Sequence, residues 1–223
     1  RAKSTKSGKR MGWGRHSDQF ETTSSHIRSM HADPVGALCQ TLRMTRSWQR
    51  RRITARGRFA LFAASTASWA SQKAGRGKGS MIGGLIALKI DKTIMSQLAR
   101  GRRTVVVTGT NGKSTTTRMT AAALATIDTV ATQADGANMD AGIVAALNVG
   151  REAPLAALEV DELHVPHVCD AVDPAAVVLL NLSRDQLDRV GEINMIERRL
   201  REGLARHPGA VVVANCDDVL VTS

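Results

Sequence analysis

The strongest chemical signal in the sequence is a glycine-rich segment followed by a lysine and two hydroxyl residues, Thr108-Gly-Thr-Asn-Gly-Lys-Ser-Thr115. It comes directly after an apolar stretch that predicts a strand, and a segment with helical spacing begins near Lys113. In such a strand–loop–helix unit, glycines let backbone N–H groups approach phosphate oxygens, and the helix N-terminus adds positive potential. We therefore expect a phosphate-binding loop that holds a nucleotide.

The residues of this loop have separate expected roles. Lys113 would reach the β- and γ-phosphates, and the Ser114 hydroxyl would bind Mg²⁺. Further nucleotide contacts are expected from Gly109, Thr110, Asn111, Gly112 and Thr115. The general pattern has a glycine where this chain has Val107, so the segment is a variant of that pattern, with its glycine at position 109.

Acidic and amide side chains follow two later predicted strands. Glu159 ends one of them, and ligands gather at the carboxyl ends of strands in open parallel sheets. Asp161 and Glu162 come next; they are expected to point elsewhere and to remain candidates for supporting the ligand-binding residues. Asn181 ends a further strand, where its amide could hold a loop, and Asp185 could orient a cation or cap a helix. These positions predict a ligand site at one edge of a sheet.

The elements that must position these residues alternate regularly along the chain. Apolar β-branched runs predict strands at 104–108, 129–132, 155–160, 175–182 and 209–215. Segments with helical spacing lie between most of them, at 114–125, 139–146 and 193–205. Further helices are expected from Arg56 to the break at 75–80, and around 90–98. Continuous apolar strands that alternate with helices indicate an α/β fold, a parallel sheet with helices on both faces.

Charge divides the chain into two parts. The net charge is +11, of which residues 1–56, with 13 Lys and Arg against 3 acids, contribute +10. Residues 1–55 also lack sustained apolar periodicity, so we expect a disordered basic extension, which cannot bury enough apolar surface to fold. The alternative is a basic arm that lies on anionic lipid or RNA. The globular part is expected at 56–223.

Composition excludes several classes of protein. Cys39, Cys169 and Cys216 are far apart, so neither a disulfide framework nor a zinc site is expected within these residues, and Cys169 and Cys216 are expected to be small buried residues. The apolar stretch 59–70 is too short and too weakly hydrophobic to span a bilayer. We therefore expect a cytoplasmic protein.

His164 and His167 are expected to be surface or loop histidines.

The form Gly-Thr-Asn-Gly-Lys-Ser at 109–114 resembles that of Mur ligases, the ATP-dependent amide-forming enzymes of cell-wall synthesis, and of folylpolyglutamate synthases. Other stretches in the same order narrow the resemblance: Gly79-Ser-Met-Ile-Gly-Gly84, Gly136-Ala-Asn-Met139, Leu158-Glu-Val-Asp-Glu162, Asn181-Leu-Ser-Arg-Asp-Gln-Leu-Asp-Arg189 and Asn215-Cys-Asp-Asp218. Together they are similar to the MurT group of that family, the Mur-ligase-like subunits of lipid II isoglutaminyl synthases. The similarity covers about residues 56–223.

This resemblance implies a central ATP-binding domain with a P-loop-type sheet, and ATP and Mg²⁺ as cofactors. The implied reaction phosphorylates the α-carboxylate of D-glutamate in the lipid II stem peptide, and ammonia then attacks the acyl phosphate to give D-isoglutamine. A GatD-type glutaminase partner would supply the ammonia. Lys113 would be the catalytic residue, Glu159 a Mg²⁺ ligand beside Ser114, and Asn215 a contact to adenine.

Two departures from the family pattern argue against a second metal ion in the site. Gln186 stands where many Mur ligases have a histidine that helps to bind a second metal, and Lys113 is the last lysine, so no carbamylated lysine follows. We therefore expect one Mg²⁺ site. Asn138 is expected to face either the nucleotide or the substrate.

The chain stops at Ser223, just after a predicted strand and its loop, so we expect an incomplete central domain that is inactive by itself. A zinc ribbon and a C-terminal domain would lie downstream. Alternatives are another Mur ligase, a folylpolyglutamate synthase-like ligase, or a basic P-loop protein that binds nucleic acid. The stretches at 136–139 and 184–189 argue against the first two, and the lack of aromatic residues for base stacking argues against the third. Expected partners are therefore lipid II and the glutaminase, with no nucleic acid, and any membrane contact is peripheral and made through the substrate.

Overall fold

The computed structural model describes residues 53–73, 80–133, 136–182 and 190–222. All of them lie within one compact unit, Ser47–Ser223. No helix in these four ranges is both long enough and apolar enough to cross a bilayer.

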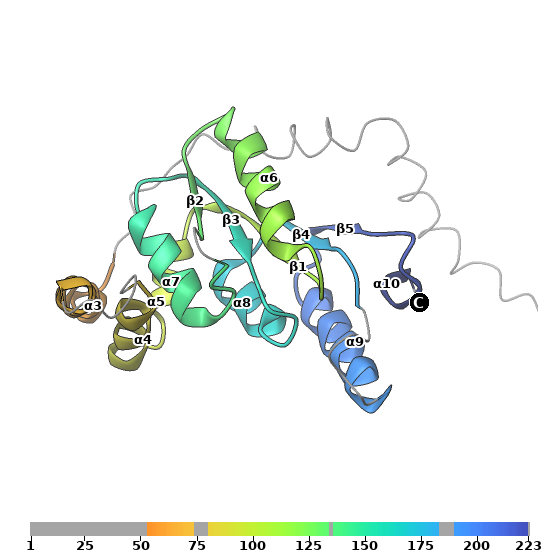
Figure 1. Ribbon diagram of the computed structural model, residues 1–223, viewed down its shortest axis with the longest axis horizontal. Coiled ribbons are helices and arrows are strands. Elements are labelled where there is room, and N and C mark those ends of the chain that lie inside the picture. Colours follow the sequence, from red (N-terminus) through yellow and green to blue (C-terminus); the bar gives the residue numbers. More distant parts are fainter. Residues whose placement is uncertain (1–52, 74–79, 134–135, 183–189, 223) are drawn as a thin grey trace, which may run out of the picture. The chain divides into compact units, whose positions relative to one another are not determined.

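The centre of this unit is a parallel sheet in the order β2-β3-β1-β4-β5 (Figure 1). The strands are β1 Arg103–Thr108, β2 Val130–Thr132, β3 Leu155–Glu159, β4 Ala176–Leu179 and β5 Val211–Ala214. Nearly all side chains of β1 and β3 are buried, and most of them are apolar, as is typical of a sheet covered on both faces. Val107 of β1 pairs with Glu159, and Thr108 pairs with Leu179 of β4, so the carboxyl ends of the three central strands meet at one edge.

Helices cover both faces of the sheet. In chain order they are α3 Ala55–Lys73, α4 Ser80–Ile90, α5 Ile94–Ala99, α6 Lys113–Ala125, α7 Asp140–Val149, α8 Val165–Val172, α9 Val190–Ala205 and α10 Val219–Thr222. Helix α6 lies on one face, and α7, α8 and α9 lie on the other (Figure 1). This division follows from the strand order, because a right-handed connection places its helix on a face that depends on the direction in which the chain moves along the sheet. The chain moves from β1 toward the β2 edge through α6, and then back toward the β5 edge through α7, α8 and α9. The expected α/β class and parallel sheet are confirmed.

Three described helices were not expected from the sequence: α4, α8 and the four-residue α10. Helix α8 falls in a segment with a proline and several polar residues, yet Val165, Val168, Cys169 and Val172 recur at helical spacing and are buried. Pro166 lies in its first turn, where the missing N–H costs no hydrogen bond. Helix α4 contains two adjacent glycines, which weaken its helical signal.

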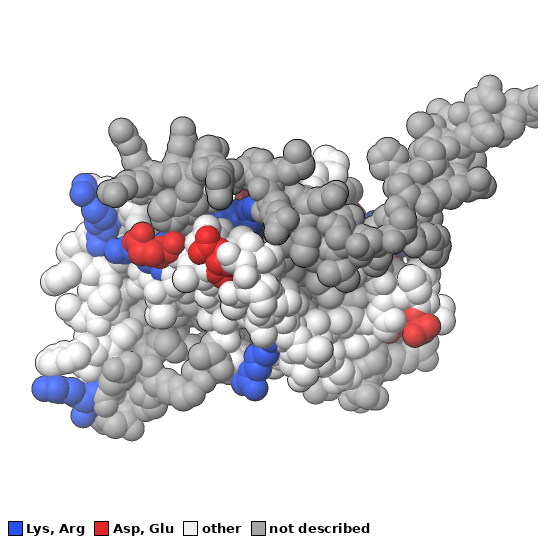
Figure 2. Space-filling view, turned by 90° about the horizontal axis from the view of Figure 1, so that it is seen from above, with Lys and Arg blue, Asp and Glu red and all other residues white. Residues whose placement is uncertain are grey.

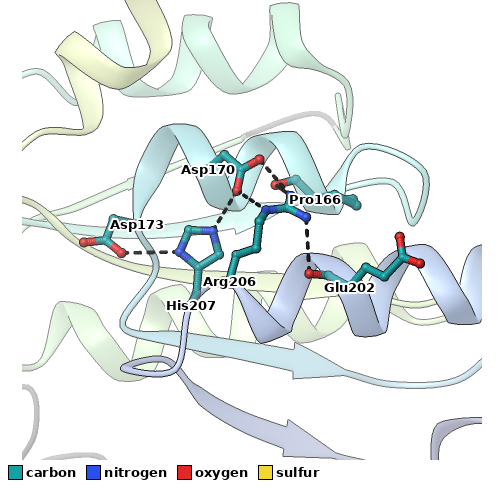
Figure 3. A network of polar contacts seen from close by, with 6 residues as sticks. All are labelled: Pro166, Asp170, Asp173, Glu202, Arg206 and His207. Atoms are coloured by element: carbon teal, nitrogen blue, oxygen red, sulfur yellow. Dashed lines mark hydrogen bonds and ion pairs between the residues drawn. The ribbon is translucent and has the colours of Figure 1, made fainter.

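A polar network joins the end of α9 to α8 (Figure 3). The Arg206 guanidinium donates to both carboxylate oxygens of Asp170, at 3.0 and 2.8 Å. His207 Nε2 lies 3.0 Å from the same carboxylate. The hydrogen bond from Arg206 lowers the pKa of Asp170. The network therefore anchors the turn that leads into β5.

Glycines allow α4 to pack closely between α3 and α7. A Cβ atom at Gly84 would lie 1.9 Å from the Ala141 carbonyl oxygen of α7, and one at Gly83 would lie 2.9 Å from the Ala64 carbonyl oxygen of α3. Both obstructing atoms belong to helix backbones, which cannot rotate away as a side chain can. The contact therefore requires glycine at these positions.

We expect the Gly84→Ala variant to be less stable than the unsubstituted chain, because its methyl group must force α4 and α7 apart. Overpacking of this kind costs about 2 kcal/mol, even though alanine favours a helix. That loss corresponds to a fall in melting temperature of roughly 4–8 °C. The matched control is Gly209→Ala, since a Cβ atom at Gly209 would meet nothing within 4 Å. Equal melting temperatures for the two variants, measured by circular dichroism, would contradict the packing argument.

Candidate nucleotide-binding site

The loop between β1 and α6 has a backbone that glycine makes possible. Gly109 has a φ of 137° and Gly112 a φ of 84°, which other residues rarely adopt. The first hydrogen bond of α6 runs from the Thr116 N–H group to the Gly112 carbonyl, at 3.0 Å. The N–H groups of Lys113 and Ser114 therefore have no acceptor within the helix, and they lie at its positive end. This is the arrangement that binds phosphate at helix N-termini.

Asn181, in the segment that follows β4, holds this loop from beside the neighbouring strand. Its backbone carbonyl accepts from the Thr110 N–H group at 2.9 Å. Its side chain accepts from the Asn111 N–H group at 2.8 Å and donates to the Asn111 carbonyl at 3.0 Å. The structure thus confirms that the Asn181 amide holds a loop, and that loop is the glycine-rich segment between β1 and α6.

Lys113 folds back over the loop instead of extending into solvent. Its Nζ donates to the carbonyl oxygens of Gly109 and Thr110, and it lies 3.4 Å from Oε2 of Glu162. The lysine and glutamate side chains are only 13% and 12% exposed. The expectation that Glu162 points elsewhere is therefore wrong, because the tight turn before α8 directs its carboxylate toward the lysine.

Ser114 and Glu159 face a common space. A Cβ atom at Gly136 would lie 3.4 Å from Ser114 Oγ and 3.9 Å from Glu159 Oε2. Gly136 has a φ of 67°, so glycine both permits the backbone turn and leaves the space open. Glu159 is 4% exposed at the end of β3. A hydroxyl and a buried carboxylate beside a phosphate loop are suitable ligands for Mg²⁺, so the donor set fits that ion.

Gln133 positions Glu159, and the sequence analysis missed it. The Gln133 side chain donates to the Glu159 carbonyl at 2.8 Å and accepts from the Glu159 N–H group at 3.0 Å. Gln133 follows directly after β2, so its buried amide continues the pairing with β3 that the β2 backbone has ended. A polar residue just after a strand was the only signal, and it does not reveal the partner.

Asn215 lies at the same edge of the sheet, after β5. Its N–H group donates to the Leu179 carbonyl at 3.0 Å, and its side chain accepts from the Asp217 N–H group at 3.1 Å. The residue is exposed, and β4 lies between its strand and the loop strand β1. The structure therefore places Asn215 on the edge that carries the loop, in a turn of its own.

The remaining candidates fall into two groups. Asp185, Gln186 and Asp188 lie outside the described residues. Asn138 is half-buried, and its carbonyl accepts from the Asp161 N–H group at 3.0 Å, which ties together the two loops after β2 and β3. Asn138 thus lies beside the site and is fixed through its backbone.

The two described cysteines differ in their environments. Cys169 is fully buried on the inner side of α8, as expected, and burial raises the pKa of its thiol to about 12. Cys216 is exposed, so the expectation that it is buried is wrong. It occupies the turn after β5, an edge strand whose Val212 and Val213 are also exposed. A thiol with so high a pKa is unsuited to nucleophilic chemistry, so Cys169 has a packing role.

The fold and the loop define a class of protein. The family model for the Mur ligase middle domain matches residues 107–222, which include the whole loop and four of the five strands in full. The chain therefore belongs to the Mur ligase family. Among solved structures, MurF from Acinetobacter baumannii has a similar fold, with a TM-score of 0.51 and 22% identity over 63% of this chain and 32% of that one.

Curated relatives narrow this assignment to one group within the family. The chain is 38% identical over 149 residues to the MurT subunit of lipid II isoglutaminyl synthase (glutamine-hydrolyzing) from Streptococcus pneumoniae, covering 65% of this chain and 33% of the relative. It is 34% identical over 167 residues to the same subunit from Staphylococcus aureus, covering 73% and 38%. The resemblance to the MurT group is thus confirmed. The chain spans about a third of the length of these relatives.

Proposed function

We propose that this chain binds ATP with one Mg²⁺ ion and carries the nucleotide half of an amide-forming active site. The single observation that carries the proposal is the shared space between Ser114 Oγ and Glu159 Oε2 at the start of α6. In this arrangement the loop N–H groups and Lys113 hold the phosphates, while Ser114 and Glu159 hold the metal ion. Gly109, Thr110, Asn111, Gly112 and Thr115 supply the remaining loop contacts, and Asn215 contacts adenine.

The proposed reaction follows the relatives, which are named as subunits of a glutamine-hydrolyzing lipid II isoglutaminyl synthase. The α-carboxylate of D-glutamate in the stem peptide attacks the γ-phosphate, ADP leaves, and ammonia from a GatD-type partner displaces phosphate from the acyl phosphate. Two anions meet in the first step, so positive charge from Lys113 and the bound Mg²⁺ lowers the repulsion between them. In domain terms, 56–223 is the central ATP-binding domain and 1–55 is a basic extension.

Lys113 must change partners for this role. In the structure it is paired with Glu162 and two loop carbonyls, all acceptors that phosphate oxygens can replace. Glu162 thus holds the lysine over the loop before the nucleotide binds. This pre-positioning lowers the entropy lost when a long side chain is fixed on the phosphates.

One face of the described residues gives no support to the nucleic-acid alternative. On the face shown in Figure 2, described Lys and Arg side chains form small separate groups, with acidic groups beside some of them. Binding to a nucleic-acid backbone requires a continuous basic stripe or patch. The ligase proposal is therefore the better supported one.

A chimera tests the ligase proposal. Residues 107–222 would replace the matching segment of the Streptococcus pneumoniae MurT relative, which would then be purified with its glutaminase partner. With ATP, Mg²⁺, glutamine and lipid II, we expect the mass decrease that accompanies replacement of a hydroxyl by an amino group. The same chimera carrying Lys113→Ala should be inactive. A folded chimera that binds Mg²⁺-ATP but does not amidate lipid II would contradict the proposed reaction.

A further inference from the structure

Three side chains from two separate segments converge near the start of α8. Asp140 is the first residue of α7, His164 directly precedes α8, and His167 lies in its first turn. Asp140 Oδ1 lies 3.0 Å from His164 Nδ1 and 2.7 Å from His167 Nε2. One potential ligand atom from each residue lies within 4.8 Å of the other two. The sequence analysis treated both histidines as ordinary surface residues, because Asp140 is remote from them in the chain.

The backbone holds these three residues in place. The Asp161 N–H group donates to the Asn138 carbonyl at 3.0 Å, which joins the loop that carries Asp140 to the loop that carries the histidines. The Asp161 side chain then accepts from the Leu163 N–H group at 3.1 Å, and its carbonyl accepts from the His164 N–H group at 2.9 Å. The cluster is therefore built on a fixed turn and not on freely moving surface side chains.

From this geometry we propose that Asp140, His164 and His167 form a zinc-binding site, separate from the Ser114–Glu159 pair. Two imidazole nitrogens and one carboxylate oxygen are a set that zinc accepts, whereas Mg²⁺ prefers oxygen ligands alone. Zinc–ligand bonds of about 2.1 Å place tetrahedral ligands roughly 3.3 Å apart, so small side-chain shifts would admit the ion. The fourth position is left for water or an anionic group.

Exposure of the three side chains agrees with an accessible site. Asp140 is 34% exposed, His164 27% and His167 50%, so an ion from solvent can reach all three. The ion would take the place of the hydrogen bonds that now join the imidazole nitrogens to the carboxylate. It would also link α7 to α8 beside the loops that lead from Gly136 and Glu159.

The competing explanation is a purely hydrogen-bonded cluster, in which the Asp140 oxygen accepts from both imidazoles and no metal binds. Zinc titration of the full chain separates the two. The protein is first treated with a chelator, and zinc is then added in the presence of excess Mg²⁺ with binding followed by calorimetry. Cobalt(II) gives a second readout, because its visible absorbance reports tetrahedral nitrogen and oxygen ligands.

We expect one zinc ion whose affinity falls at least about tenfold in His167→Ala and in Asp140→Asn, since each variant removes a direct ligand. The controls are His207→Gln and Cys216→Ser, which alter the other described histidine and the exposed thiol and should leave this affinity unchanged. Any zinc held by His16, His26, His31 or Cys39 would persist in all of these variants. Unchanged zinc binding in both cluster variants, or no zinc binding by the unsubstituted chain, would overturn the proposal.

Thermal melting gives a second measurement of zinc binding that requires no nucleotide and also shows whether each variant is folded. Zinc at saturating concentration should raise the melting temperature of the unsubstituted chain and of the two controls, but not that of His167→Ala. His167 is half exposed, so its replacement alone leaves the core intact. Since no ATP is present, a negative result rejects the zinc site without bearing on the proposed ligase function.

Discussion

Replacing Lys113 by alanine is expected to weaken binding of Mg²⁺-ATP by about a hundredfold, because the loss of charged hydrogen bonds to phosphate costs about 3 kcal/mol. The lysine side chain is only 13% exposed, so water would not fully replace it as a donor. Isothermal titration calorimetry on the full chain measures this loss directly. Binding within threefold of the unsubstituted chain would contradict the phosphate role of Lys113.

The contact with Glu162 determines how this result must be controlled. Lys113→Ala leaves the largely buried Glu162 carboxylate without its cation, which destabilises the protein for a reason unrelated to nucleotide. The double variant Lys113→Ala with Glu162→Gln removes that cost and should still fail to bind. Glu162→Gln alone should bind ATP about as well as the unsubstituted chain, since the lysine loses a competing partner and a pre-positioning one at the same time. Arg118→Ala, an exposed position on α6, is the matched loss of a cation.

The sequence predicted the fold well because the signals that determine it are local. Each strand of the sheet is a short apolar run, and the helices between them keep the spacing that buries one side. The glycines and lysine of the loop lie within one short segment, so their pattern predicts both the turn and the expected chemistry. Four of the five strands are shorter than predicted, as in β4, which ends at Leu179 where we expected 182, whereas β1 begins one residue earlier than predicted. Residues beyond that point leave the sheet to hold the loop.

Contacts between distant segments could not be predicted in the same way. Glu162 and Lys113 are 49 residues apart, and Gln133 and Glu159 are 26 apart. Neither pair has a spacing rule, because both depend on how parallel strands bring their ends together. Asp140 and the two histidines are a further case, since the turn after β3 directs the histidines toward α7. The sequence analysis therefore found the glycine-rich loop and Asn181, which holds it, but missed the contacts made by Glu162 and Gln133.

Replacing Glu159 by glutamine is expected to abolish most of the contribution of Mg²⁺ to nucleotide binding. The substitution keeps the size and shape of the side chain but removes the negative charge that faces the space beside Ser114 Oγ. Mutation of a residue that only supports a metal ligand weakens metal binding by about ten- to a hundredfold. Loss of a direct ligand such as Glu159 should therefore weaken Mg²⁺ binding by at least about tenfold. ATP titrations with and without Mg²⁺ separate this effect from direct phosphate contacts.

Stability provides the control for this last variant. The backbone of Glu159 is held by Gln133 through two hydrogen bonds that the substitution leaves in place. Glu159 is 4% exposed, and burial of a negative charge without a cation is costly. The metal-free Glu159→Gln protein should therefore melt no lower than the unsubstituted chain. Added Mg²⁺-ATP should raise the melting temperature of the unsubstituted chain much more than that of the variant. Glu152→Gln, an exposed acid before β3, should behave like the unsubstituted chain. If Mg²⁺ strengthens ATP binding equally in both variants, Glu159 is not the metal ligand, and the hydroxyl of Ser114 must hold the ion with a different partner.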